Sequence, residues 1–210
     1  MFSRYAVSSP IKRALDIVGA LALLVLMGPI LICAAAAVLA VDGGPVVYRH
    51  RRVGRDGERF DCLKLRSMRR DADAALRRIL ANDPAARAEW EAYRKLRRDP
   101  RVLPLIGMLL RRTSLDELPQ LFNVLWGRMS LVGPRPVTVE ELERYGEVRA
   151  HYLAVRPGLS GRWQVSGRSD ISFGARTQID RRYVETATLG ADLWILLMTP
   201  LAVLFGRGSA

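Results

Sequence analysis

Two adjacent carboxylates, Asp116 and Glu117, could do chemistry, because they follow paired arginines at the predicted start of a helix. The stretch at residues 111–121 reads RRTSLDELPQL. One interpretation is structural: Ser114 and Glu117 form a capping box, and acids are favoured at helix N-termini. The other is that both acids act on an anionic substrate across a metal ion, whose preferred ligands are carboxylate and phosphate oxygens. The surrounding residues must decide between these two interpretations.

Pro119 complicates the local structure around the two acids. If Ser114 is the N-cap, Pro119 falls at the fifth helical position, where a backbone donor is lost. If Asp116 is the N-cap, Pro119 fits at the third position, but the Asp116 side chain is then tied to the backbone. We predict Ser114 as the cap, followed by a helix with a distorted second turn.

Several cationic side chains could meet a phosphate group beside these acids. Lys64 and Arg66 alternate with apolar residues along a predicted strand at residues 59–65, so both point to one face. Arg112 directly precedes the acidic stretch, and Arg135 stands between two prolines in a stiff, extended backbone. The guanidinium fork of arginine matches two phosphate oxygens at once.

An apolar segment without charged side chains covers residues 17–41, which is long enough for a membrane helix. Gly28 and Pro29 lie at its centre, and proline removes a backbone donor, so a break is predicted there. Both flanks are basic, and basic flanks favour the cytoplasmic side. A helix that enters and leaves by one face and an ordinary kinked span both remain open, and a buried core helix is a third interpretation.

After the apolar segment, the sequence predicts a small β-hairpin with its turn at residues 54–57. Helical patterns follow, and Asp83 with Pro84 marks the start of a second amphipathic helix. Two further apolar stretches, residues 102–110 and 193–205, are too short to span a membrane. We expect them to lie at its surface as interfacial helices.

The 210 residues contain no internal repeat or low-complexity linker, so a single domain covering residues 1–210 is predicted. Its expected fold class is α+β and mainly helical. The membrane helix occupies residues 14–41 and the remaining part residues 43–210. A formal charge of +12 indicates an anionic partner, and dispersed arginines without stacking aromatics argue against nucleic acid.

Six blocks of sequence, in this order, resemble those of one protein family. They are KRALD at residues 12–16, FDCLKLRSM at 60–68, RTSLDELPQL at 112–121, MSLVGPRP at 129–136, RPGLSG at 156–161 and WQVSGR at 163–168. On these blocks the chain resembles the bacterial sugar transferases, monotopic polyprenyl-phosphate phosphoglycosyl transferases that start exopolysaccharide and O-antigen repeat units. It looks like the short catalytic form, without the membrane helices that some members carry upstream.

The resemblance implies transfer of a sugar-1-phosphate from a UDP-sugar to polyprenyl (undecaprenyl) phosphate, with release of UMP. Asp116 would be the nucleophile of a covalent phosphoglycosyl intermediate, Glu117 its partner, and both would bind Mg²⁺. The expected substrate and phosphate contacts are Lys64, Arg66, Arg112, Arg135 and Arg168.

The resemblance also implies a location. The family's membrane helix is re-entrant and broken at a proline that matches Pro29, which favours the one-sided course. The catalytic part, residues 43–210, is then expected on the cytoplasmic face of the bacterial inner membrane, in contact with membrane lipid. Homodimer formation stays open.

Chemical reasoning agrees with this implied reaction. A carboxylate that attacks a diphosphate meets negative charge, which Mg²⁺ and arginines neutralise. A covalent intermediate lets one pocket serve two large substrates in turn, and therefore predicts ping-pong kinetics. The block at residues 163–168, followed by Asp170, favours a hexose-1-phosphate donor, UDP-galactose or UDP-glucose.

One residue departs from the family pattern. Members commonly carry an acid before the MSLVGPRP block, and this chain has Arg128 there, which puts a role for an acid in doubt. The alternative to an enzyme is a non-enzymatic, membrane-anchored basic module that binds anionic lipid or recruits polysaccharide machinery. That alternative predicts that Asp116→Asn leaves function intact.

Overall fold

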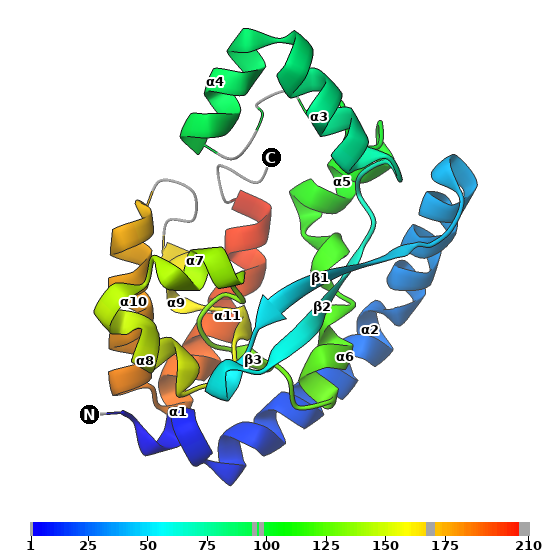
Figure 1. The fold of residues 1–210 in the computed structure, drawn as a ribbon. Coiled ribbons are helices and arrows are strands. Elements are labelled where there is room, and N and C mark those ends of the chain that lie inside the picture. Colours follow the sequence, from blue (N-terminus) through cyan, green and yellow to red (C-terminus); the bar gives the residue numbers. More distant parts are fainter. Residues whose placement is uncertain (1, 94–95, 97–98, 167–170, 206–210) are drawn as a thin grey trace.

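The computed structural model describes residues 2–93, 96, 99–166 and 171–205. Figure 1 shows a long helix along one side of the molecule, a β-hairpin beside it and a group of shorter helices beyond the hairpin. The protein is α+β and mainly helical, which confirms the predicted class. In chain order the elements are α1 (Arg4–Ser8), α2 (Pro10–Asp42), β1 (Val47–Val53), η1 (Arg55–Gly57), β2 (Arg59–Leu65), α3 (Ala72–Asn82), α4 (Pro84–Tyr93), α5 (Ile106–Thr113), η2 (Leu115–Glu117), α6 (Gln120–Leu125), β3 (Ser130–Val132), α7 (Val139–Glu143), η3 (Gly146–Val148), α8 (Arg149–Leu153), β4 (Gly158–Ser160), α9 (Arg162–Ser166), α10 (Phe173–Thr186) and α11 (Leu189–Phe205).

The long apolar helix is α2. It begins at Pro10, a favoured first-turn residue, after Ser9, whose hydroxyl accepts a hydrogen bond from a first-turn amide. It ends at Gly43, whose φ of 65° suits glycine. The break predicted at Gly28 and Pro29 is absent: α2 is continuous with Pro29 inside it, and it changes direction near its middle (Figure 1). The loss of one backbone hydrogen bond bends this helix without ending it.

Both halves of α2 pack against the rest of the protein. Near its N-terminus, the Nζ of Lys12 lies 2.6 Å from Oδ2 of Asp192 in α11, and Asp16 accepts a hydrogen bond from the Leu131 amide at 2.8 Å. Near its C-terminus, Val38 is buried in a cluster with residues of β2 and α5. Within the described residues, α2 is the one helix long and apolar enough to cross a membrane. Its re-entrant course stays a prediction.

The predicted β-hairpin is confirmed. Strands β1 and β2 pair antiparallel, with Val47 opposite Leu65 and Val53 opposite Arg59. The turn at residues 54–57 contains the 3-10 turn η1, in which Asp56 has a positive φ of 57°. This hairpin carries Lys64 toward the end of its second strand.

A second, smaller sheet joins distant parts of the chain. Strands β3 and β4 pair parallel, with Ser130 opposite Gly158 and Val132 opposite Ser160. Three-residue strands carry too short a pattern to predict, and their pairing depends on close backbone approach.

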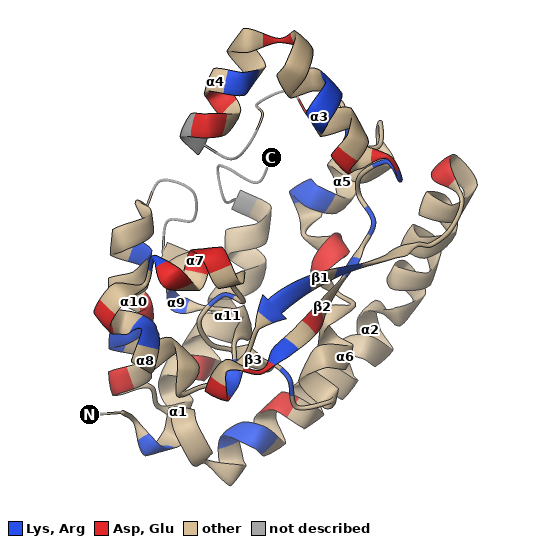
Figure 2. Cartoon of the chain, viewed as in Figure 1, with Lys and Arg blue, Asp and Glu red and all other residues tan. Residues whose placement is uncertain are grey.

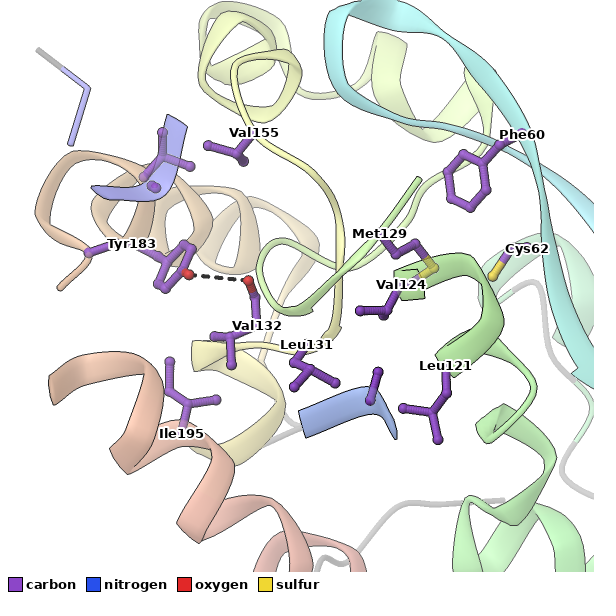
Figure 3. Packing of buried hydrophobic residues seen from close by; sticks show 14 residues of the cluster. Phe60, Cys62, Leu121, Val124, Met129, Leu131, Val132, Val155, Tyr183 and Ile195 are labelled. Atoms are coloured by element: carbon purple, nitrogen blue, oxygen red, sulfur yellow. Dashed lines mark hydrogen bonds between the residues drawn. The ribbon is translucent and has the colours of Figure 1, made fainter. Parts of the chain in front are cut away.

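The main core connects β2, α6, β3 and the C-terminal helices α10 and α11 (Figure 3). Its members include Phe60 from β2, Leu121 from α6 and Ile195 from α11. The Tyr183 hydroxyl of α10 donates a hydrogen bond to the carbonyl oxygen of Val132 in β3 at 3.2 Å. The core therefore fixes β2 and α6, the two elements that flank the acidic pair.

The helical pair α3 and α4 stands apart from the other helices in Figure 1. The Asp83 carboxylate accepts hydrogen bonds from the amides of Ala85 and Ala86 at 2.9 and 3.0 Å. Pro84 opens α4, which confirms the predicted helix start. The two short apolar stretches are also helical, in α5 and α11.

Candidate active site

The acidic pair lies on a short turn between two helices. Helix α5 ends at Thr113, and Ser114 adopts a left-handed backbone with a φ of 56°. Asp116 and Glu117 belong to the 3-10 turn η2, and α6 begins only at Gln120. The predicted capping box is wrong, because the Ser114 side chain makes no capping hydrogen bond.

Pro119 accounts for this arrangement. It stands immediately before α6, where its missing N–H group is not needed and its fixed φ suits the start of a helix. The predicted single helix with a distorted second turn is therefore two elements, a 3-10 turn and a separate helix. Neither element uses Asp116 as a side-chain cap.

Asp116 is a buried carboxyl group, only 9% exposed. Burial raises the pKa of Asp116 to about 6. The positive charges of Lys64 and Arg111 act to lower this pKa, and the negative charge of Glu117 acts to raise it. Asp116 is thus a poorly hydrated carboxylate at neutral pH, held beside cations, which suits a nucleophile.

Glu117 lies between two cations. The Nζ of Lys64 donates a hydrogen bond to its Oε1 at 2.7 Å, and Nη2 of Arg135 lies 3.8 Å from the same oxygen. Two of the predicted cations therefore meet at the acidic pair. They line one small cavity with seven other residues, namely Arg52, Cys62, Glu117, Gln120, Pro136, Leu159 and Gln164.

The position of Arg135 is fixed by close backbone packing. The Gly133 amide donates a hydrogen bond to Ser160 at 2.9 Å, and the Gly158 amide donates one to Pro134 at 2.7 Å. A Cβ atom on Gly133 would lie 2.6 Å from the carbonyl oxygen of Arg156, so only glycine fits.

Asn123 holds β2 against α6, beside the site. Its Oδ1 accepts a hydrogen bond from the Leu63 amide at 3.0 Å, and its Nδ2 donates one to the Asp61 carbonyl at 2.9 Å. Lys64 follows directly in the strand. The sequence interpretation missed this residue, since a lone asparagine in a helix carries no pattern that identifies its partner.

Arg66 lies elsewhere, at the end of α2. Its Nη2 donates hydrogen bonds to the carbonyl oxygens of Asp42 and Gly43, and it is 3.2 Å from Oδ2 of Asp42. The side chain is buried, and its Nε and Nη1 have no partner within the described residues. In this arrangement Arg66 attaches α2 to the hairpin.

Within the described residues, neither of the other two predicted phosphate contacts, Arg112 and Arg168, is observed at the acidic pair. Arg112 is exposed at the end of α5, and its neighbour Arg111 is the one whose charge acts on Asp116. Arg168 lies outside the described residues. Arg128, which stands where family members commonly carry an acid, forms an exposed ion pair with Glu58 on the hairpin. Its role here is a surface contact.

Arg52 is a further cavity residue that the sequence interpretation missed. Its side chain is only 13% exposed and donates a hydrogen bond to Glu141 at 2.7 Å. The hairpin register places Arg52 opposite Phe60 and two positions from the pair of His50 and Cys62. Period-two alternation along both strands would have placed Arg52 on the same face as Lys64.

The acidic pair can supply two carboxylates to a metal ion. Within the described residues no cluster of three His, Cys, Asp or Glu side chains could hold one. Mg²⁺ typically takes one or two protein carboxylates together with substrate phosphates, so the residues fit a metal that arrives with a diphosphate. Figure 2 shows acidic η2 following the basic end of α5, with basic positions on both hairpin strands.

Fold and site together define a mainly helical protein with one long apolar helix and an acidic pair faced by cations, of which Asp116 is buried and Glu117 half-buried. A family profile for bacterial sugar transferases matches residues 7–206. The chain belongs to the bacterial sugar transferase family.

Three relatives illustrate the similarity. The chain is 50% identical over 199 residues to the undecaprenyl-phosphate galactose phosphotransferase of Salmonella typhimurium, an alignment that covers 95% of this chain and 41% of the relative. It is 47% identical over 198 residues to the exopolysaccharide production protein ExoY of Rhizobium meliloti, covering 94% of this chain and 87% of that one. It is 37% identical over 197 residues to the UDP-glucose:undecaprenyl-phosphate glucose-1-phosphate transferase of Escherichia coli, covering 90% and 39%.

Proposed function

We propose that this protein transfers a sugar-1-phosphate from a UDP-sugar to undecaprenyl phosphate, in the first membrane step of polysaccharide synthesis. The observation that carries the proposal is the buried Asp116 beside Glu117, with Lys64 and Arg135 gathered at the same place. Family membership and the names of the relatives support the same reaction.

The reaction proceeds in two displacements at one phosphorus atom. A carboxylate oxygen of Asp116 attacks the phosphorus that carries the sugar, the bond to the UMP oxygen breaks, and UMP leaves with the bonding electron pair. An oxygen of the polyprenyl phosphate then attacks the same phosphorus. The bond to Asp116 breaks, which restores the carboxylate and releases the sugar-diphosphate lipid.

The cations provide the electrostatic part of this chemistry. Lys64 and Arg135 lower the repulsion between an attacking carboxylate and a diphosphate. A phosphate group that enters the cavity draws the Lys64 ammonium from Glu117, which frees that carboxylate. Asp116 and Glu117 would then hold Mg²⁺, which supplies further charge neutralisation at the diphosphate oxygens.

The proposed membrane association rests on exposed apolar side chains. The exposed side chains include Val25 and Ile32 of α2, Leu105 before α5, and Leu197 and Leu204 of α11. Because both halves of α2 are attached to one protein body, we propose that α2 enters and leaves by the same membrane face. That face is the cytoplasmic side of the bacterial inner membrane, where nucleotide sugars are present.

The donor is proposed to be a UDP-hexose. The relatives include a protein named for galactose and one named for glucose, so the two hexoses are the donors to compare. The motif at residues 163–168 lies partly outside the described residues, so the test of the donor is a direct comparison of labelled sugars.

The proposal is tested with the purified protein, Mg²⁺ and radiolabelled UDP-galactose or UDP-glucose, without lipid acceptor. We expect covalent label on the wild-type protein and none on Asp116→Asn. Asp73→Asn, an exposed acid on α3, is the matched control and should label normally. Label on Asp116→Asn would refute the nucleophile assignment, and unchanged cellular function of this variant would favour the non-enzymatic module.

A further inference from the structure

A second polar cavity lies where α1, the start of α2 and the hairpin turn come together. It has a volume of about 300 Å³. None of its lining residues lines the cavity that holds Glu117, Lys64 and Arg135. In the proposed reaction, both substrates use the pocket beside Asp116 and Glu117, one after the other. That reaction therefore assigns no role to the second cavity.

Three arginines from separate parts of the chain line this cavity: Arg13 of α2, Arg55 of η1 and Arg156, which precedes β4. Because they line one cavity, the three guanidinium groups lie near one another. Burial lowers the pKa of Arg156, the positive charges of Arg55 and Arg13 lower it further, and the negative charges of Asp16 and Asp56 act in the opposite direction. Gathering like charges in a partly buried space is unfavourable unless an anion offsets it.

Main-chain carbonyl groups orient all three arginines, and Nη1 of Arg55 donates a hydrogen bond to Val7 at 3.4 Å. The Nη1 and Nη2 of Arg13 donate hydrogen bonds to Val124 and Leu125 at 2.7 and 2.9 Å. The Nε of Arg156 donates one to Gly127 at 2.8 Å. Neither Arg13 nor Arg156 forms an ion pair with an acidic side chain in the part of the chain that the structure describes. Carbonyl groups hold the guanidiniums in place but supply no full negative charge.

The other charged residues that line this cavity do not cancel the positive charge of the three arginines. Lys12 is paired with Asp192 at 2.6 Å. Asp16, the acid that lines the cavity, is engaged by the Ser130 hydroxyl and the Leu131 amide, both at 2.8 Å. The carboxylate of Asp56, which pairs with Arg55, is 72% exposed and is not part of this wall.

The cavity lies at the N-terminal end of the apolar helix α2. It includes Pro10, the first residue of α2, and neighbouring Ile11 is 59% exposed. Trp126, adjacent to the Gly127 carbonyl that Arg156 contacts, is 63% exposed. Exposed tryptophan is typical of the membrane–water interface, where lipid phosphates also lie.

We propose that Arg13, Arg55 and Arg156 form a binding site for a phosphate group, separate from the acidic pair. Arginine forks suit the oxygens of a phosphate group approached from several directions. The phosphate can belong to the headgroup of an anionic phospholipid or be free in solution. A lipid phosphate bound here holds the start of α2 at the level of the headgroups.

The test uses the full chain in neutral detergent and four proteins: wild type, Arg55→Gln, Arg156→Gln and the control Arg51→Gln. Arg51 lies on the same hairpin, is 64% exposed and pairs with Asp61 outside the cavity. Phosphatidylglycerol and phosphatidylcholine binding is measured by native mass spectrometry, and inorganic phosphate binding by calorimetry. Circular dichroism establishes that each variant is folded.

We expect one tightly bound phosphatidylglycerol on wild type and on Arg51→Gln. Each cavity variant should bind it about tenfold more weakly, the effect of one charge-assisted hydrogen bond. Inorganic phosphate that binds with the same dependence on the variants, without tighter lipid binding, supports the site with free phosphate as its ligand. Equal binding of both probes to wild type and both cavity variants would overturn the proposal. If Arg156→Gln fails to fold, the more exposed Arg55→Gln decides alone.

Discussion

At the residue scale, the chemistry depends on the protonation of Asp116. In the proposed reaction its carboxyl must be ionised to attack phosphorus, and its pKa is raised to about 6 by burial. We therefore expect the initial rate of covalent labelling to rise with pH through about 6 and to level off above it. Below pH 6 the rate should fall roughly tenfold per pH unit. A rate that stays constant between pH 5 and pH 8 would contradict this assignment.

The raised pKa of Asp116 also predicts how the stability of the protein depends on pH. The pKa of Asp116 is 3.8 in the reference state and about 6 in the folded protein, so the folded state binds the proton more tightly. Stability is therefore lost as pH rises through this range, and above pH 6 the buried charge costs roughly 2–3 kcal/mol. Asp116→Asn removes the charge, and its thermal unfolding midpoint at pH 8 should exceed that of wild type.

The higher thermal unfolding midpoint of Asp116→Asn should disappear at pH 4, where the wild-type Asp116 carboxyl is protonated in the folded protein. Asp73→Asn, on exposed α3, serves as the control and should show no gain that depends on pH. A destabilised Asp116→Asn at pH 8 would mean that the carboxylate is stabilised by its cations more than it is penalised by burial.

At the element scale, the loop that carries Arg135 depends on the contact between β3 and β4. Gly133→Ala would place a Cβ atom 2.6 Å from the Arg156 carbonyl and 2.9 Å from the Gly158 amide, both backbone atoms. We expect a loss of about 1–3 kcal/mol in stability and a reduced labelling rate, because the loop must shift. Gly174→Ala in α10 is the matched control, since a Cβ there meets nothing within 4 Å. Equal unfolding midpoints for the two variants would contradict the prediction.

The elements also show what the sequence can predict. Periodicity and turn residues predicted the hairpin, the start of α4 and the long apolar helix, because each depends on local preferences. The capping box failed because Ser114 takes a left-handed backbone conformation, which residue types alone do not reveal. The pairing of β3 with β4 depends on packing between distant segments. The continuous course of α2 shows that the one backbone hydrogen bond lost at Pro29 does not end a helix.

The candidate site was predictable to a similar extent. Adjacent acids and the arginine between prolines were visible as residue patterns, and the family resemblance gave them roles. The contact of Arg66 with the end of α2 could not be predicted from the sequence. The alternation that places Lys64 on one face of β2 continues to Arg66, although Arg66 binds at a different place. Arg111 and Arg112 are neighbours in sequence, and only the end of a helix decides which one faces Asp116.

At the scale of the whole molecule, the course of α2 makes a topological prediction. Single cysteines at Ser8, before the helix, and at Gly44, after it, are introduced into a protein whose exposed Cys33 has been replaced by serine. Because both ends of α2 are attached to one body, an impermeant thiol reagent should reach both positions from the same side of sealed vesicles. Labelling of the two positions from opposite sides would establish an ordinary span instead.

The ion pair between Lys12 and Asp192 joins residues 180 positions apart. A ribosome therefore delivers Lys12 and the apolar helix long before the acid that neutralises it. For most of synthesis, the nascent chain carries the apolar helix α2 before the C-terminal part against which it packs has been made. We therefore expect lipid to hold this segment first, so that insertion precedes folding and the growing chain assembles around a helix that is already in the membrane.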